Sequence, residues 1–140
     1  MTTCYFDSSA LSKRYVEEAG TAWVRGLTAP TAGNTVLSAR ITMVEVYSAL
    51  ARRRREGSVH SATEYEFVEL SVEAVSLARG LLDRHSLRAN DAVQLASALI
   101  ADAALIDAGL APLLFISSDE RLNSAAEREG LAVDNPNSHV

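Results

Sequence analysis

Short runs of apolar residues alternate along the chain with longer stretches in which apolar residues recur at helical spacing. The short runs predict strands at residues 2–6, 35–40, 67–70, 113–116 and 131–133. Uninterrupted apolar strands such as residues 113–116 are typical of a parallel sheet that helices cover on both faces. The alternation therefore predicts an α/β domain with parallel strands.

The stretches between these strands predict helices. They are expected from Ser8 or Ser9 to about Glu18, over Thr21–Leu27, from Thr42 to Arg52–Arg55, after Ser71, from Asn90 or Asp91, and from Asp119 to Gly130. Gly20 is the expected stop of the first helix. The expected apolar stripe of the fourth is Val72, Val75, Ala78 and Leu82. No repeat or linker interrupts residues 1–140, so we expect one domain, with residues 135–140 as a frayed tail.

Four acidic residues lie at junctions between these elements rather than on helix surfaces. Asp7 follows the first strand, Glu45 lies in the first turn of the helix after the second, and Asp119 follows the fourth. Asp91 lies at the start of its own helix. Ligands of an open parallel sheet bind outside the carboxyl ends of the strands, where helix N-termini also point. The four carboxylates are therefore expected at one rim of the sheet.

Each acid alone also fits a structural role. Thr42 and Glu45 have the spacing of a capping box, and Asp7, Asp91 and Asp119 fit the preferences of helix N-caps. Four carboxylates at one rim would repel one another unless cations were present. Hard oxygen ligands suit Mg²⁺ or Mn²⁺, ions that commonly serve phosphate chemistry. The set therefore favours a metal site, although each acid separately could be a cap.

Composition and charge narrow the class of protein. A net charge of −5 and a pI near 5.1 argue against non-specific binding of nucleic acid over the whole surface. A single cysteine excludes an internal disulfide, and His60, His85 and His139 share no metal-ligand spacing. The start of the sequence does not resemble a signal peptide, so we expect a cytoplasmic protein. Residues 92–116 make a poor membrane span, since Asp102, Asp107, Gly109 and Pro112 interrupt them.

Four stretches of the chain together resemble the PIN domain family, and within it the VapC-type toxins of bacterial toxin–antitoxin pairs. They are YFDSSALSKRY, TMVEVYSAL, SLRANDAVQLASAL and LLFISSDERLNSAAEREGL, in the family's order. The resemblance implies a three-layer α/β/α fold with a five-stranded parallel sheet in the order 3-2-1-4-5. It also implies a four-acid site with Mg²⁺ or Mn²⁺ as cofactor. The acids fall on Asp7, Glu45, Asp91 and Asp119, and Ser9 and Ser117 fall on positions that orient carboxylates or waters.

The expected activity is that of a metal-dependent endoribonuclease that hydrolyses RNA phosphodiester bonds. The expected partners are an RNA substrate and a VapB-like antitoxin, with a homodimer or a toxin–antitoxin hetero-oligomer as the assembly. The apolar face of residues 20–50 is the expected dimer interface. The alternative is a PIN-like module that binds RNA or a partner, and metal, without turnover. A phospho-receiver domain fits poorly, since Ser71 rather than an aspartate follows the third strand.

Basic residues near the predicted rim are candidates for contact with substrate. They are Lys13, Arg14, Arg40 and Arg88. Arg52–Arg55 either bind phosphates or complement the dipole of the helix that they end. The connection GSVHSATEYE after this helix is shorter than in VapC-like chains, which puts antitoxin or RNA contacts there in question.

Overall fold

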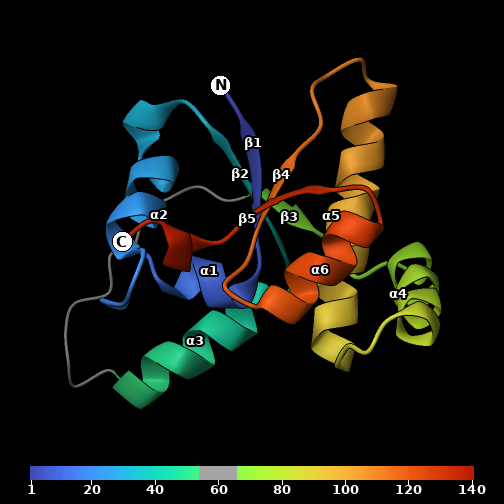
Figure 1. Cartoon of the computed structure of the whole chain (residues 1–140), viewed down its shortest axis with the longest axis horizontal. Coiled ribbons are helices and arrows are strands. Elements are labelled where there is room, and N and C mark those ends of the chain that lie inside the picture. Colours follow the sequence, from blue (N-terminus) through green and yellow to red (C-terminus); the bar gives the residue numbers. More distant parts are fainter. Residues whose placement is uncertain (54–65) are drawn as a thin grey trace.

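The computed structural model describes residues 1–53 and 66–140. Its five strands are β1 (Thr3–Phe6), β2 (Thr35–Ala39), β3 (Glu66–Val68), β4 (Leu114–Ile116) and β5 (Ala132–Asp134). They form one parallel sheet in the order β3-β2-β1-β4-β5 (Figure 1). The predicted fold class and strand order are confirmed. The connection after α3 and the side chains of Arg52–Arg55 lie outside what the structure describes.

Helices lie on both sides of the sheet, as Figure 1 shows. They are α1 (Ser8–Ser12), α2 (Thr21–Thr28), α3 (Thr42–Arg53), α4 (Val72–Arg84), α5 (Ala89–Asp107) and α6 (Glu120–Arg128), with short 3-10 helices η1 (Pro30–Ala32) and η2 (Pro136–Ser138). Because successive side chains of a strand point to opposite faces, β1 supplies both cores. Tyr5 packs with residues of α4, α5 and α6, whereas Cys4 and Phe6 pack with residues of α1, α2 and α3.

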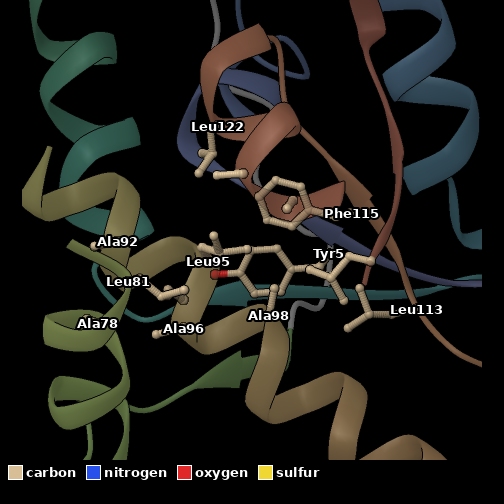
Figure 2. Close-up of a cluster of buried hydrophobic side chains, with 14 of the residues drawn as sticks. Tyr5, Ala78, Leu81, Ala92, Leu95, Ala96, Ala98, Leu113, Phe115 and Leu122 are labelled. Atoms are coloured by element: carbon tan, nitrogen blue, oxygen red, sulfur yellow. The ribbon is translucent and has the colours of Figure 1, made fainter. Parts of the chain in front are cut away.

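The core on the α5 side is built around two stacked aromatic rings. Tyr5 and Phe115, on neighbouring strands, lie with ring centroids 5.6 Å apart and nearly parallel planes. Figure 2 shows them among aliphatic side chains of the covering helices, including Leu81, Leu95 and Leu122. In the described part of the chain, α5 alone is long and apolar enough to cross a membrane. Its apolar character has a structural use, because its first half packs in this core.

The apolar stripe predicted for α4 is wrong except at Ala78, which is buried as expected. Val72 is 89% exposed, Val75 is 43% exposed and Leu82 is 41% exposed. The buried face instead carries Ala74, Ala78 and Leu81. Both the observed set and the predicted set have the spacing of one helix face. The position of α5 against α4 determines which of the two faces is buried.

The first helix is shorter than predicted. The α-helix ends at Ser12, and Gly20 is not its stop but the N-cap of α2, in the left-handed conformation with φ of 84°. A Cβ at Gly20 would lie 2.2 Å from the carbonyl oxygen of Pro136. Glycine is therefore required here both by its backbone angle and by the close approach of the C-terminal segment.

The C-terminal segment, predicted as a frayed tail, contacts the rest of the fold in the structure. Pro136 is buried, and the His139 ring stacks on Trp23 of α2 with centroids 3.9 Å apart. His139 Nε2 also lies 2.8 Å from Asp134 Oδ1 at the end of β5. The end of the chain therefore packs beside α2, where Figure 1 places the C-terminus.

Candidate acidic site

Asp7 lies at the point where β1 leaves the core and α1 begins. Its backbone N–H donates to the Ile116 carbonyl and so continues the pairing of β1 with β4. Its side chain caps α1 by accepting a hydrogen bond from Ala10 N at 2.9 Å. Asp7 as a whole residue is only 4% exposed. The predicted N-cap role of Asp7 is confirmed, and the same geometry fixes the carboxylate at the rim of the sheet.

Two serine hydroxyls contact this carboxylate directly. Ser117 Oγ donates to Asp7 Oδ2 at 2.6 Å, and Ser9 Oγ donates to Oδ1 at 2.7 Å. Burial raises the pKa of Asp7 to about 6; the hydrogen bonds from Ser117, Ala10 and Ser9 oppose this rise, and the negative charge of Asp91 adds to it. Asp7 is thus a rigidly oriented carboxylate whose ionised form lacks solvation and has no cationic partner among the described residues.

Asp91 and Asp119 differ in how their helices use them. Asp119 is the N-cap of α6, and its Oδ1 accepts from the backbone N–H groups of Arg121 and Leu122. Asp91 is not an N-cap, since α5 begins at Ala89 with Arg88 in the cap position. Burial and the charge of Asp119 raise the pKa of Asp91, the backbone N–H and charge of Arg88 oppose this, and Glu45 adds to the rise.

Glu45 is held by side chains from other helices rather than by a capping box. Its Oε1 accepts from Ser8 Oγ at 2.6 Å and from Gln94 Nε2 at 3.2 Å, and its Oε2 accepts from Asn90 Nδ2 at 3.3 Å. The Thr42 hydroxyl, its expected capping partner, accepts from Gln94 instead. The side-chain bonds of Thr42 and Glu45 therefore tie α3 to α1 and α5.

The structure brings the four predicted acids into one electrostatic neighbourhood. Asp91 interacts electrostatically with Asp7, Glu45 and Asp119. Among residues 1–53 and 66–140, however, no three Asp, Glu, His or Cys side chains are grouped closely enough to hold one ion as they stand. The cluster is acidic and converging, but it is not a preformed cage.

The donor set nevertheless fits a hard divalent cation. Carboxylate and hydroxyl oxygens are the ligands that Mg²⁺ and Mn²⁺ prefer. Mg²⁺ usually keeps several waters and uses one or two protein carboxylates together with substrate phosphates, so a closed cage is not needed. Oδ2 of Asp119 accepts no hydrogen bond from the described residues, which leaves it available to such an ion.

Two hollows border the acids Glu45 and Asp91. One is lined by Ser8, Ser9, Ser12, Val44, Glu45, Ser48 and Asn90, and the other by Glu45, Arg88, Ala89, Asn90 and Asp91. Because Glu45 and Asn90 line both hollows, the two hollows adjoin each other beside Glu45 and Asp91. Arg88 is exposed at its edge.

The other basic candidates are engaged elsewhere. Lys13 is buried and forms an ion pair with Glu18 at 3.1 Å. Arg14 donates to the Thr28 hydroxyl of α2. Arg40 lies at the end of β2, but it pairs with Glu69 and covers the Phe67 ring. Of the four predicted substrate contacts, Arg88 is the one that the structure places against the acids.

Sequence reasoning missed the side chains that position Glu45, which are Ser8, Asn90 and Gln94. Gln94 carries a readable signal: it is a polar residue within the apolar stretch AVQLASAL, three residues after Asp91. That spacing places it on nearly the same face of α5 as the acid.

Comparisons with known proteins agree with this arrangement. A family model described as PIN domain matches residues 4–128. Two proteins of Mycobacterium tuberculosis, Ribonuclease VapC45 of strain CDC 1551 / Oshkosh and Ribonuclease VapC49 of strain ATCC 25618 / H37Rv, are each 33% identical over 149 aligned positions that cover 95% of both chains. A crystal structure of VapBC2 from Rickettsia felis bound to a promoter DNA fragment shares the fold, with a TM-score of 0.62 at 10% identity, over 96% of this chain and 98% of that one. The chain therefore belongs to the PIN domain family, as a member of its VapC type.

Proposed function

We propose that this protein is the toxin ribonuclease of a VapBC-like toxin–antitoxin pair, and that it hydrolyses RNA phosphodiester bonds with Mg²⁺ or Mn²⁺ at Asp7, Glu45, Asp91 and Asp119. One observation carries most of the proposal. A nearly buried carboxylate, Asp7, is oriented by Ser9 and Ser117 near the negative charge of Asp91, and no cationic side chain among the described residues pairs with it. A bound cation would supply the missing charge.

The chain's own residues divide the remaining work. Ser9 and Ser117 fix the rotamer of Asp7 by donating to opposite oxygens. Ser117 Oγ also accepts from Asp119 N at 3.0 Å, so one hydroxyl links the first acid to the start of α6. The metal ion, when bound, would activate a water and offset the charge that grows on the phosphate. Arg88 is the proposed contact for a phosphate of the substrate, since it lines the same hollow as Asp91.

Cleavage of RNA by the purified protein tests this proposal. Activity with Mg²⁺ should be lost with EDTA and in Asp7→Asn, since both remove the ion or its buried ligand. Asp102→Asn is the matched control: Asp102 lies near the far end of α5, and its Oδ1 accepts from Leu113 N, a bond that asparagine retains. Equal activity of Asp7→Asn and Asp102→Asn would contradict the proposal.

The second candidate function is a PIN-like module that binds RNA or a partner without cutting it. Its support is the incomplete convergence of the acids among the described residues. Binding of Mn²⁺ and of RNA without any cleavage would favour this function over the ribonuclease.

The proposed partner is a small VapB-like antitoxin, with a homodimer as the proposed toxin assembly. Exposed apolar side chains of α3 fall within the region predicted for the dimer interface: Met43, Val44 and Tyr47, of which Tyr47 is 71% exposed. Tyr47→Arg should lower the molar mass measured by light scattering if these side chains form the dimer contact. An unchanged mass would remove α3 from the interface.

A further inference from the structure

Gln94 occupies an unusual place beneath the acidic site. Gln94 lies on α5 and is only 3% exposed, and its side-chain amide contacts three other elements. Nε2 lies within hydrogen-bond distance of three acceptors: Thr42 Oγ1 at 2.8 Å, Ser8 Oγ at 3.1 Å and Glu45 Oε1 at 3.2 Å. Because the NH₂ group has two hydrogens, one of them is shared between two of these acceptors. Oε1 accepts from the Tyr5 hydroxyl at 2.8 Å. One amide thus joins β1, α1, α3 and α5.

Hydrogen-bond chemistry fixes the orientation of this amide. An ionised carboxylate only accepts hydrogen bonds, so the NH₂ group of Gln94 must face Glu45. The amide oxygen then faces Tyr5, whose hydroxyl must donate. Tyr5 is fully buried, and its side chain extends from β1 toward α5 in Figure 2. The Glu45 carboxylate therefore excludes the flipped amide, whose oxygen would repel it, and the Tyr5 hydroxyl anchors the amide by donating to its oxygen.

Glu45 depends on this network because its other contacts are few. Apart from Gln94, its carboxylate accepts from Ser8 at 2.6 Å and from Asn90 at a long 3.3 Å. Ser8 is itself part of the network, since its hydroxyl accepts from Gln94 and donates to Glu45. A glutamate side chain has several rotatable bonds, and ordering it costs conformational entropy that neighbours must offset.

We infer that Gln94, oriented by the Tyr5 hydroxyl, is a positioning residue that fixes the Glu45 carboxylate at the acidic site. The inference rests on the proposed function for its consequence in catalysis, but not for its consequence in geometry. In a purely structural role, Gln94 would only provide hydrogen-bond partners for the buried hydroxyl groups of Tyr5 and Thr42. The positioning role requires in addition that Glu45 loses its fixed orientation when the amide is removed.

The main test uses Gln94→Leu, which keeps the approximate volume and removes every hydrogen bond of the amide. We expect about 10–100-fold loss of kcat for RNA cleavage and of Mn²⁺ affinity, the range typical of residues that orient metal ligands. KM for RNA should change less, because Gln94 is buried away from solvent. Crystals of the metal-free variant should show Glu45 released from Ser8. Tyr5→Phe should change kcat and Mn²⁺ affinity in the same direction by a smaller factor, since only the orienting donor is lost.

Asp102→Ala is the matched control for stability. It removes a side-chain hydrogen bond from the same helix, eight residues and therefore about 12 Å further along, with no link to Glu45. We expect a lower Tm with unchanged kcat and Mn²⁺ affinity. If Gln94→Leu does not fold, Tyr5→Phe decides by the same measurements.

The outcomes separate this inference from the proposed function. Unchanged Mn²⁺ affinity together with an unmoved Glu45 in Gln94→Leu, or in Tyr5→Phe if the first variant does not fold, overturns the inference even if the wild-type protein cleaves RNA. If the wild-type protein binds Mn²⁺ without cleaving RNA, the ribonuclease proposal fails. A displaced Glu45 with weakened Mn²⁺ binding would then still support the positioning role of Gln94.

Discussion

Replacing Asp7 by asparagine is expected to stabilise the folded protein at neutral pH in the absence of metal. Burial raises the pKa of Asp7 from an ordinary 3.8 to about 6, so the folded state binds a proton that the unfolded state has already released. The contribution of Asp7 to stability is therefore greatest below pH 3.8, falls as the pH rises toward about 6, and stays lowered above it. Asparagine has no charge to desolvate, so the variant escapes this loss.

The size of the effect follows from the two pKa values. At about 1.4 kcal/mol for each pH unit between them, ionised Asp7 costs the folded state about 3 kcal/mol at pH 7. Asparagine can still accept from Ala10 N and Ser9 Oγ, but its NH₂ group would face Ser117 Oγ, which now donates to Asp7. The hydrogen bond that Ser117 donates to Asp7 would therefore be lost, which costs about 1 kcal/mol of the stability gained. The net gain expected for Asp7→Asn is about 2 kcal/mol.

Urea unfolding in EDTA between pH 4 and pH 8 measures this difference. Trp23, the single tryptophan, reports on unfolding by fluorescence, and circular dichroism checks the result. The difference in free energy of unfolding between variant and wild type should grow from pH 4 to pH 6 and be constant above pH 6. A variant that is less stable than wild type at pH 7, or a gap that does not change with pH, would refute the argument that ionised Asp7 is a buried, uncompensated charge.

Two further predictions concern packing. Gly20→Ala should destabilise the protein by more than about 1–3 kcal/mol, the usual cost of a strained backbone position, because its Cβ would also meet the Pro136 carbonyl. Gly33→Ala has a similar positive φ but open space around it, so urea unfolding should show a distinctly smaller loss; equal losses would mean that the tail does not press on Gly20. Leu81→Ala should cost about 2–5 kcal/mol, as for a buried leucine, whereas Leu82→Ala should cost less than half as much, since Leu82 is 41% exposed. Similar losses for the two, measured by denaturant unfolding, would argue against the observed face of α4.

The junction acids could be predicted from the sequence because their position depends on local rules. Asp7 and Asp119 each follow a short apolar run and precede a helical pattern, and parallel strands bring such junctions to one edge. The strand order was predicted from the resemblance to a known family and not from these local rules. The hydrogen bonds that the acids accept, and the helices that donate them, depend on contacts between distant parts of the chain.

Other features depended on those distant contacts and were predicted wrongly or not at all. The rows of α4 that carry Val72 and Ala74 are both apolar, so spacing alone did not decide which faces α5. The composition of residues 135–140 favours fraying, but Trp23 and Gly20 provide a surface on which these residues pack. Lys13 has the right charge to bind a phosphate, yet it forms an ion pair with Glu18 in the structure.

The hydrogen bond between Asp7 and Ser117 joins residues 110 positions apart in the chain. The central strand β1 is made first during synthesis, but its neighbour β4 and the hydroxyl that orients Asp7 are made near the end. A nascent or truncated chain that stops before Ser117 would contain Asp7, Glu45 and Asp91 and still lack the contact that fixes the first of them. The Asp7 carboxylate can therefore be fixed only near the end of synthesis, when nearly the whole chain has been made.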